Sequence, residues 1–485
     1  MALKFPGSQR SAHTHSLKRR SPSLTRRDLL RLGALGAGAS LLPAGRSRAG
    51  VGPGPHRFLQ INLEGGWDSA FACDPVVGTK RTEANGGSYD NAYGSADLAT
   101  QTVDGKALVI GPGLIVPDRV GPFARLPTAF INGMFMEVSG HDFAAQYMSS
   151  GILSLTNTRD YPSIPAILGE ATQSFPSHIV LGTAAPLGDT RFTSPPLQAF
   201  SSDALNPMVA GPTAVLIGPG GAFPDQFDPN DPARAAAFEQ LVGDAHGLID
   251  GLDDLVVGRL PATYQNDLAT WRASAAQIQE VYAKRLGGAL KPSDEVAGRY
   301  GFAPGSSGAG PEESLAAAFL LLKSNLSPYV TVTFASFDSH SDQIAVQLPL
   351  MQRFTLALDA LVTDLLATDD PSSPGLKLAD TTTIYITSEF VRTPIFTVAT
   401  GGTEHWPSAS AILMGRGVQD GAVIGATGDN AEALGWDGFE PVAFSDTTQL
   451  LPDHLIATIL ANIAGESVAD TVSAVRLDGL FATKG

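Results

Sequence analysis

Cysteine is almost absent from this chain of 485 residues, in which Cys73 is the only one. A chain with one cysteine can form no internal disulfide, so its stability must come from packing. Two familiar motifs are missing as well. No Gly-x-Ser-x-Gly pattern occurs, which weakens a serine-esterase interpretation. Gly218–Gly221 is not followed by Lys and Ser or Thr, so it is not a nucleotide-binding loop.

Basic residues are scarce beyond the amino-terminal segment. The chain has 32 Lys and Arg against 48 Asp and Glu, a formal net charge of −16. Residues 1–49 hold ten Lys and Arg and one acidic residue, Asp28, a net charge of +9 that leaves −25 for the remainder. So acidic a mature chain argues against nucleic acid or an anionic membrane surface as a partner.

Long apolar runs are also missing, and the amino-terminal one is short. A basic stretch (TRRDLLR, Thr25–Arg31) precedes the apolar run Leu32–Leu42, and small residues follow at Ser47–Ala49. These parts in this order predict a secretory signal, and Arg26-Arg27 resembles the twin-arginine type. We expect the twin-arginine export machinery as a partner, cleavage after Ala49, and a periplasmic or extracellular protein without a stable membrane span. A basic tail with a chance apolar run is one alternative. An uncleaved anchor is another, although a membrane helix needs ~20 apolar residues.

Predicted strands and helices alternate over residues 50–485. This alternation predicts a single α/β domain with a largely parallel central sheet. Residues 184–230 are rich in Pro, Gly and Ser, and helical periodicity follows from Asp231 to about Leu286. We therefore expect an irregular and helical insertion at about residues 184–310.

Several predicted boundaries concern the candidate site. Ser139 and Asp142 have the spacing of a capping box at the start of a helix. Gly151 predicts the end of that helix, and Ile152–Thr156 has the composition of a strand. A later amphipathic helix is predicted to begin near Pro349.

Acidic residues follow three of the predicted strands. Phe58–Leu63, Tyr329–Ser336 and Thr383–Thr387 lead to Asp68, Asp338 and Glu389. If these strands are neighbours, the three carboxylates meet at one edge, where their repulsion raises their pKa values unless a cation is present. Two histidines add imidazole ligands, and such a mixed set suits zinc, manganese or iron better than calcium. The predicted divalent-metal ligands are Asp68, Asp338, His340, Glu389 and His405.

Alternatives stay open for individual residues. An acidic residue after a strand commonly caps the next helix, and an isolated histidine is often structural. Arg392 either clamps an anionic substrate or neutralises Glu389 and Asp338. His141 opens a helix, whose unpaired N–H groups suit an anion; in the alternative, Ser139 only caps that helix.

At these residues the chain resembles a bacterial family labelled domain of unknown function 1501, which is related to sulfatases within the alkaline-phosphatase-like superfamily. The resemblance runs from about Phe58 to Leu480. It rests on the segments FLQINLEGGWDS, SGHDFAAQYMSSG, YPSIPAIL, VTFASFDSHSDQ, TIYITSEFVRTP, GGTEHW, AILMGRG and GAVIG. It implies a three-layer α/β fold, with a central sheet between helices and a one- or two-metal site. By position, Asp68 resembles the first-strand metal ligand, Asp338 and His340 a later Asp and His pair, and His405 the last His ligand.

The resemblance also implies hydrolysis or transfer of phosphate or sulfate esters through a Ser, Thr or modified Cys at a helix N-terminus. Two departures affect this expectation. Counting back ten residues from Gly151 reaches His141 in place of that nucleophile. Ser388-Glu389 stands where the superfamily enzymes carry an adjacent Asp and His. The imidazole of His141 could form a phosphohistidine-like intermediate or bind metal, or Ser139 or Ser69 could substitute as the nucleophile; none of these is the superfamily pattern.

We therefore expect an exported, metal-binding, hydrolase-like protein acting on an anionic small-molecule or polymer ester, with Ser139, His141 and Arg392 as its catalytic or anion-binding residues. The alternative is a catalytically silent periplasmic or surface module that keeps the fold for binding or assembly. A third interpretation, an unrelated α/β protein, holds only if Asp68, Asp338 and His405 lie far apart.

Overall fold

The computed structural model describes residues 56–75, 94–155 (without 104–105 and 119), 161–182 (without 173 and 175–177), 197–199, 292–304 and 310–482 (without 395–396, 398, 429–430 and 473). All of these lie in the second of two compact units, residues 45–485. The expected export signal and most of the expected insertion lie outside the described residues. None of the described helices is long and apolar enough to cross a membrane.

An eight-stranded sheet forms the centre of the fold, with the strand order β12-β4-β11-β8-β1-β7-β5-β6. The strands are β1 (Arg57–Leu63), β4 (Thr128–Phe135), β5 (Ile179–Leu181), β6 (Leu197–Ala199), β7 (Tyr329–Phe334), β8 (Thr382–Thr387), β11 (Ser408–Gly415) and β12 (Ala422–Ile424). Strand β11 is antiparallel to β4 and β8. The other neighbouring pairs are parallel. The expected α/β class with a largely parallel sheet is confirmed.

The three central strands are buried almost continuously because helices cover both faces of the sheet. Strands β7 and β8 are buried throughout, and β1 is buried except at Asn62. Asn62 lies opposite Thr333 of β7 on one side and Thr387 of β8 on the other. The carboxyl ends of β8, β1 and β7 therefore lie side by side at one edge of the sheet.

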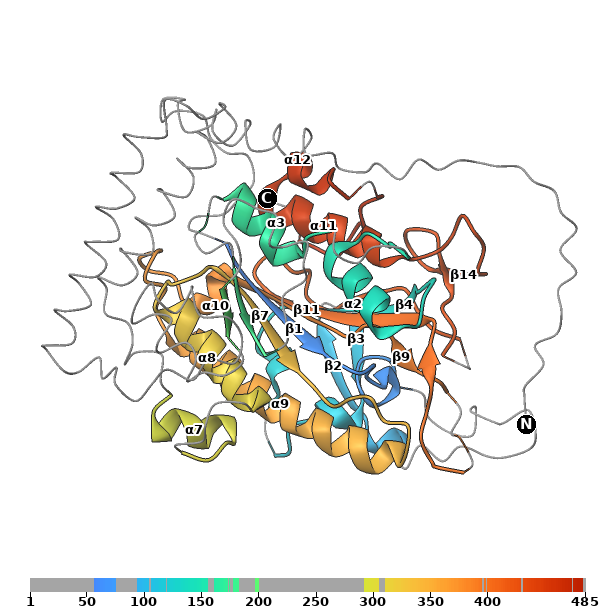
Figure 1. Ribbon diagram of the computed structural model, residues 1–485, viewed down its shortest axis with the longest axis horizontal. Coiled ribbons are helices and arrows are strands. Elements are labelled where there is room, and N and C mark those ends of the chain that lie inside the picture. The colour runs from blue at the N-terminus through green and yellow to red at the C-terminus, as the bar shows by residue number, and fades with distance from the viewer. Residues whose placement is uncertain are drawn as a thin grey trace, which may run out of the picture. The chain divides into compact units, whose positions relative to one another are not determined.

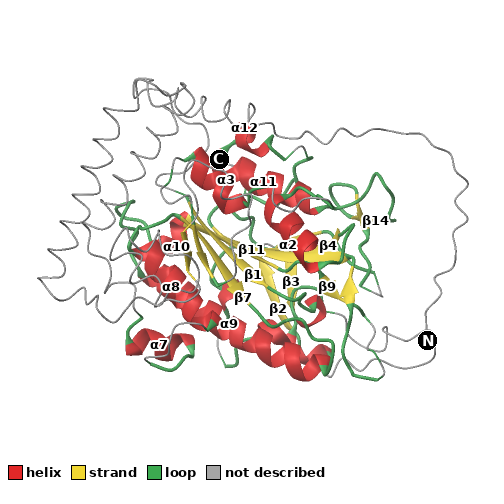
Figure 2. Cartoon of the chain, viewed as in Figure 1, coloured by secondary structure: helices red, strands yellow, loops and turns green. Residues whose placement is uncertain are grey.

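The helices form two outer layers, drawn in red on either side of the yellow sheet in Figure 2. One layer contains α7 (Asp294–Tyr300), α8 (Pro311–Lys323), α9 (Gln343–Ala367) and α10 (Leu378–Thr381). The other contains α2 (His141–Ser150), α3 (Ile164–Ala171), α11 (Pro452–Ala464) and α12 (Glu466–Ala469). Leu59 and Ile61 of β1 pack with the first layer and Phe58 with the second. Figure 1 shows α8 and α9 below the sheet and α2, α3 and α11 above it.

Three two-stranded sheets accompany the central one. They are β2 (Ala99–Val103) with β3 (Lys106–Ile110), β9 (Val391–Arg392) with β10 (His405–Trp406), and β13 (Gly435–Trp436) with β14 (Pro441–Val442). The pair β9 and β10 places His405 directly opposite Arg392. This pairing returns the chain to the carboxyl edge of β8 just before β11 begins.

Two predicted boundaries are wrong. Residues 152–155 form no strand, because Gly151 ends α2 in the left-handed conformation (φ 70°), the next three residues are only half-buried and Leu155 is exposed. Helix α9 begins at Gln343, with Pro349 inside it. Pro349 lacks the N–H for the carbonyl of Ala345 one turn earlier, and both residues are exposed, so water can satisfy that carbonyl.

Candidate metal centre

The loops after β1, β7 and β8 meet at the carboxyl edge of the sheet. Gly65 of the first loop has φ 116° and lies against the loop after β7, where an added Cβ would sit 2.2 Å from the amide nitrogen of Asp338. Gly402 lies equally close to His340, because an added Cβ on Gly402 would sit 2.0 Å from the carbonyl carbon of His340. Glycine is required at both positions because no side chain fits. The two glycines therefore hold the segment that carries Asp338 in place.

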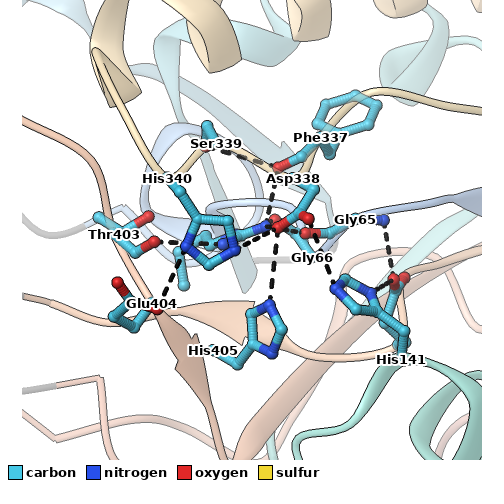
Figure 3. A network of polar contacts seen from close by, with 12 residues as sticks. Gly65, Gly66, His141, Phe337, Asp338, Ser339, His340, Thr403, Glu404 and His405 are labelled. Atoms are coloured by element: carbon cyan, nitrogen blue, oxygen red, sulfur yellow. Dashed lines mark hydrogen bonds and ion pairs between the residues drawn. The ribbon is translucent and has the colours of Figure 1, made fainter. Parts of the chain in front are cut away.

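Asp338 lies at the centre of the polar contacts in Figure 3. Its carboxylate accepts a hydrogen bond from the buried Arg392 guanidinium and lies 3.0 Å from His340 Nε2. Burial acts to raise the pKa of Asp338, but the hydrogen bond and charge of Arg392, with His340 and His141, outweigh it and hold the pKa below its usual value. Asp338 is therefore ionised at neutral pH.

His141 is the first residue of α2, and its ring lies between two carboxylates. Nδ1 is 2.8 Å from Glu389 Oε1, and Nε2 is 3.6 Å from Asp338 Oδ2. Glu389 is buried, and the amide of Gly65 donates to the same Oε1 at 2.8 Å. The ring therefore contacts Glu389 through Nδ1 and turns Nε2 towards Asp338.

His405 approaches Asp338 from a third direction. Its Nδ1 donates to the carbonyl of Ser139 at 2.8 Å. Its Nε2 lies 3.6 Å from Asp338 Oδ1, is inaccessible to water and has no hydrogen-bond partner among the described residues. Burial lowers the pKa of His405, and the charges of His141 and Arg392 add to that effect against the opposing influence of Ser139 and Asp338. The imidazole is therefore neutral at neutral pH.

His141, Asp338 and His405 form a group that could hold a metal ion, since their ligand atoms all lie within 4.8 Å of one another. A neutral imidazole and an ionised carboxylate are the forms that bind metals. Each histidine also has its other ring nitrogen held, by Glu389 or by the carbonyl of Ser139. Such outer partners usually fix the orientation of metal-binding histidines. The unpartnered Nε2 of His405 fits a site that a cation would complete.

The structure places the other predicted ligands beside this group rather than in it. Glu389 contacts the ring of His141. His340 lies between Asp338 and Glu404, with Nδ1 3.1 Å from the Glu404 carboxylate. Asp68 is buried, and its side chain accepts from the amide of Ala70 at 3.0 Å and from Gln343 Nε2 at 3.1 Å.

Arg392 and Ser139 also take positions that decide between open alternatives. The Arg392 side chain is fully buried, and it donates to backbone carbonyls of Gly65 and Gly66 as well as to Asp338. This arrangement favours the neutralising role for Asp338 over a substrate clamp. The capping box is not formed, because Gly140 is the N-cap of α2 without a side-chain hydrogen bond. Ser139 precedes the cap, and its carbonyl orients His405.

Sequence reasoning missed four residues near the site. Glu404 contacts His340, and partial burial together with the charge of Glu389 raises the pKa of Glu64. Both are acidic residues inside the quoted segments FLQINLEGGWDS and GGTEHW, and that placement was the available signal. Gln343 and Gln347 lie fully buried under the loop of Asp338. Both precede Pro349, where the helix was predicted to begin, so the expected helical periodicity carried no signal for them.

Three solved structures are similar to the chain at low sequence identity. The lipoteichoic acid synthase LtaP from Listeria monocytogenes is 9% identical, with 84% of this chain and 72% of that one covered and a TM-score of 0.36. An alkaline phosphatase superfamily protein from Vibrio parahaemolyticus is 10% identical, with coverages of 90% and 75% and a TM-score of 0.35. Alkaline phosphatase from the Antarctic bacterium TAB5 is 10% identical, with coverages of 77% and 94% and a TM-score of 0.31. No curated protein matches the sequence.

A family comparison covers most of the chain. The model of the family described as "Protein of unknown function (DUF1501)" matches residues 113–471, a range that contains His141, Asp338 and His405. The match spans more than half of the chain and agrees with the family that the sequence motifs resemble. The chain belongs to the DUF1501 family.

Proposed function

We propose that this protein is an exported, hydrolase-like protein that binds one divalent metal ion through His141, Asp338 and His405 and acts on phosphate or sulfate esters. The observation that carries the proposal is the convergence of these three ligands, with Nε2 of His405 water-inaccessible and unpartnered beside an ionised carboxylate. Two imidazoles and one carboxylate suit zinc, manganese or iron. Three protein ligands leave coordination positions for a substrate.

The surrounding residues support metal binding by fixing the three ligands. Glu389 holds the ring of His141, and the carbonyl of Ser139 holds the ring of His405. Arg392 keeps Asp338 ionised and in place. A bound divalent ion would supply Lewis-acid chemistry at an ester oxygen.

The amino terminus of α2 supports an anionic ester as the substrate. Gly140 caps this helix without a side-chain hydrogen bond, and His141 is its first residue. The first-turn N–H groups of a helix suit an anion, and the helix dipole adds a favourable charge interaction. An ester bound there would lie beside the three metal ligands.

A second candidate is a binding or assembly module without catalysis. The position that the family resemblance assigns to the nucleophile holds His141, whose ring is placed between Glu389 and Asp338. A ring held in this way is suited to metal binding, and the hydroxyl or modified thiol that the resemblance implies as the nucleophile is absent from this position. Metal binding without ester turnover would support this candidate.

The test uses purified mature chain, residues 50–485, loaded separately with zinc, manganese and iron. Each form is assayed with an aryl phosphate, a phosphodiester and an aryl sulfate, next to the variant His405→Ala. The control is His454→Ala, the same substitution on α11 outside the group. Turnover that His405→Ala abolishes and His454→Ala retains supports the enzyme. A wild-type chain that binds none of the metals contradicts the metal-dependent enzyme.

A further inference from the structure

A buried polar network lies directly under the loop of Asp338. Gln343 and Gln347 are one turn apart in the first two turns of α9, and both side chains are fully buried. Residues four apart lie on the same face of a helix, and this face continues with Met351 and Phe354 in the apolar core. The buried face of α9 therefore has two side-chain amides in its first two turns and apolar side chains after them.

Gln343 joins three segments of the site. Its Oε1 accepts hydrogen bonds from the hydroxyl groups of Ser339 and Thr403, the latter at 2.8 Å. Its Nε2 donates to Asp68 Oδ2 at 3.1 Å. Ser339 follows Asp338 in the chain, and Thr403 lies two residues before His405. One amide thus links Asp68 to the segments that carry two of the three proposed ligands.

Gln347 makes a second set of links. Its Nε2 has two hydrogens for three acceptors within reach, the carbonyls of Gly66 at 3.0 Å and Phe337 at 2.5 Å and Ser339 Oγ at 3.2 Å. Its Oε1 accepts from the amide of Asp68 at 3.1 Å. Phe337 and Ser339 flank Asp338, so both backbone neighbours of that ligand are tied to α9.

We propose that Asp68, Gln343 and Gln347 are positioning residues, which set Asp338 and His405 for metal binding without touching the metal. This inference rests on the proposed function, because it concerns the same metal site. Asp68 directs Oδ2 at Gln343, and it is absent from the group whose ligand atoms converge. A buried carboxylate needs hydrogen-bond donors, and Asp68 receives them from Gln343 and from the amide of Ala70.

Exchanging the carboxylate of Asp68 and the amide of Gln343 tests whether Asp68 positions the metal ligands or binds the metal itself. Asp68→Asn places an amide N–H₂ against the N–H₂ of Gln343, two donors without an acceptor. Gln343→Glu places a second buried carboxylate against Asp68. Asp68→Asn with Gln343→Glu together restores one donor and one acceptor and keeps the total charge. The new Glu would still accept from Ser339 and Thr403.

The experiment measures the Co²⁺ dissociation constant and the Co²⁺ absorption spectrum of wild type, the two single variants and the double variant. Each single variant should weaken Co²⁺ binding about tenfold or more, as changes to residues behind metal ligands do. The double variant should recover most of that affinity and the wild-type spectrum. The control is Asp359→Asn, a buried carboxylate farther along α9 that is paired with Arg125. It should lower thermal stability and leave Co²⁺ affinity unchanged.

The possible negative results distinguish failure of the positioning role from failure of the proposed metal site. A double variant that folds but does not regain Co²⁺ affinity overturns the positioning role, and so does a single Asp68→Asn change without effect on binding. If the double variant does not fold, Thr403→Val decides, because it removes only one hydroxyl donor to Gln343. Unchanged Co²⁺ affinity and spectrum in Thr403→Val then overturn the inference, and weakened binding supports it. A wild-type protein that binds no Co²⁺, Zn²⁺ or Mn²⁺ removes the proposed function itself.

Discussion

Glu389 illustrates how a single buried carboxylate controls a neighbouring ligand. Its Oε1 lies 2.8 Å from His141 Nδ1 and also accepts from the amide of Gly65. Glu389→Gln keeps an acceptor oxygen and removes the negative charge that increases the basicity of the imidazole. We expect metal affinity to fall about 10–100-fold, measured by competition with a chromogenic chelator. Glu404→Gln, which changes a carboxylate that contacts His340 rather than one of the three proposed ligands, should have a much smaller effect. Equal losses in the two variants would contradict this role for Glu389.

Asp364 on α9 provides a pH-dependent prediction away from the site. Burial raises the pKa of Asp364 more than the nearby Arg299 lowers it. Because the folded-state pKa of Asp364 lies above its unfolded-state pKa, the protonated carboxyl favours the folded state. This stabilisation is complete below the unfolded-state pKa and is lost as pH rises through the folded-state pKa. The ionised group therefore lowers the free energy of unfolding at pH 7. We expect Asp364→Asn to melt at a higher temperature than wild type at pH 7, and this advantage should shrink as pH falls towards ~4.

At the residue scale, the sequence indicated the right loops and left the direction of individual side chains open. Asp338 and His405 were expected from strand ends and motif order, and the structure brings both together. Asp68 was expected to face the same cation, but the turn at Gly65 (φ 116°) and Gly66 (φ 82°) precedes a short helix whose cap is Asp68 itself. The conformation of this turn depends on the loop after β7 that packs against it. The local sequence around Gly65 does not encode that contact.

At the element scale, the close approach of the β1 loop to the β7 loop can be tested with one methyl group. Gly65→Ala would place Cβ 2.2 Å from the Asp338 amide nitrogen, so the segment carrying Asp338 must move. We expect metal affinity to fall about tenfold or more, as for other changes behind a metal ligand. Gly301→Ala is the matched control, because Gly301 also has positive φ (85°) but no atom within 4 Å of a virtual Cβ. Equal metal affinity in the two variants would show that the contact does not position Asp338.

Elements with strong periodicity were predicted well, and boundaries set by tertiary contacts were not. The strand runs at Phe58, Tyr329 and Thr383 correspond to β1, β7 and β8, because both-face burial demands the β-branched and aromatic residues that they contain. The start of α9 was misplaced at Pro349 because proline is common in the first turn of a helix. Buried contacts of Gln343 and Gln347 extend this helix towards the site.

At the scale of the whole molecule, one buried ion pair secures the edge of the sheet opposite the candidate site. Arg57 at the start of β1 pairs with Asp370 after α9, and both side chains are fully buried. Asp370 also accepts from the hydroxyl of Thr381. Asp370→Asn leaves a buried guanidinium without its counter-charge, so we expect a loss of about 3–5 kcal/mol in the free energy of unfolding. Urea denaturation measures this loss, and Co²⁺ affinity of the folded variant should match wild type. Weakened Co²⁺ binding would show that the two edges are coupled.

The parallel arrangement of β8, β1 and β7 is the feature of the whole molecule that makes the candidate site. It places the segments of Asp338 and Glu389 at one edge, and the antiparallel β11 brings His405 to the same edge just before that strand begins. The alternation of predicted elements indicated this class of fold, but the position of β11 follows from long-range pairing with β4 and β8. The expected export signal lies outside the described residues and remains a prediction.

Anomalous scattering from crystals of the mature chain soaked with zinc tests the central claim most directly. The account predicts one zinc ion per chain, bound by Nε2 of His141, a carboxylate oxygen of Asp338 and Nε2 of His405, and its loss in crystals of His405→Ala. An ordered site without an anomalous peak between these three residues, in crystals that take up zinc elsewhere or not at all, would contradict it.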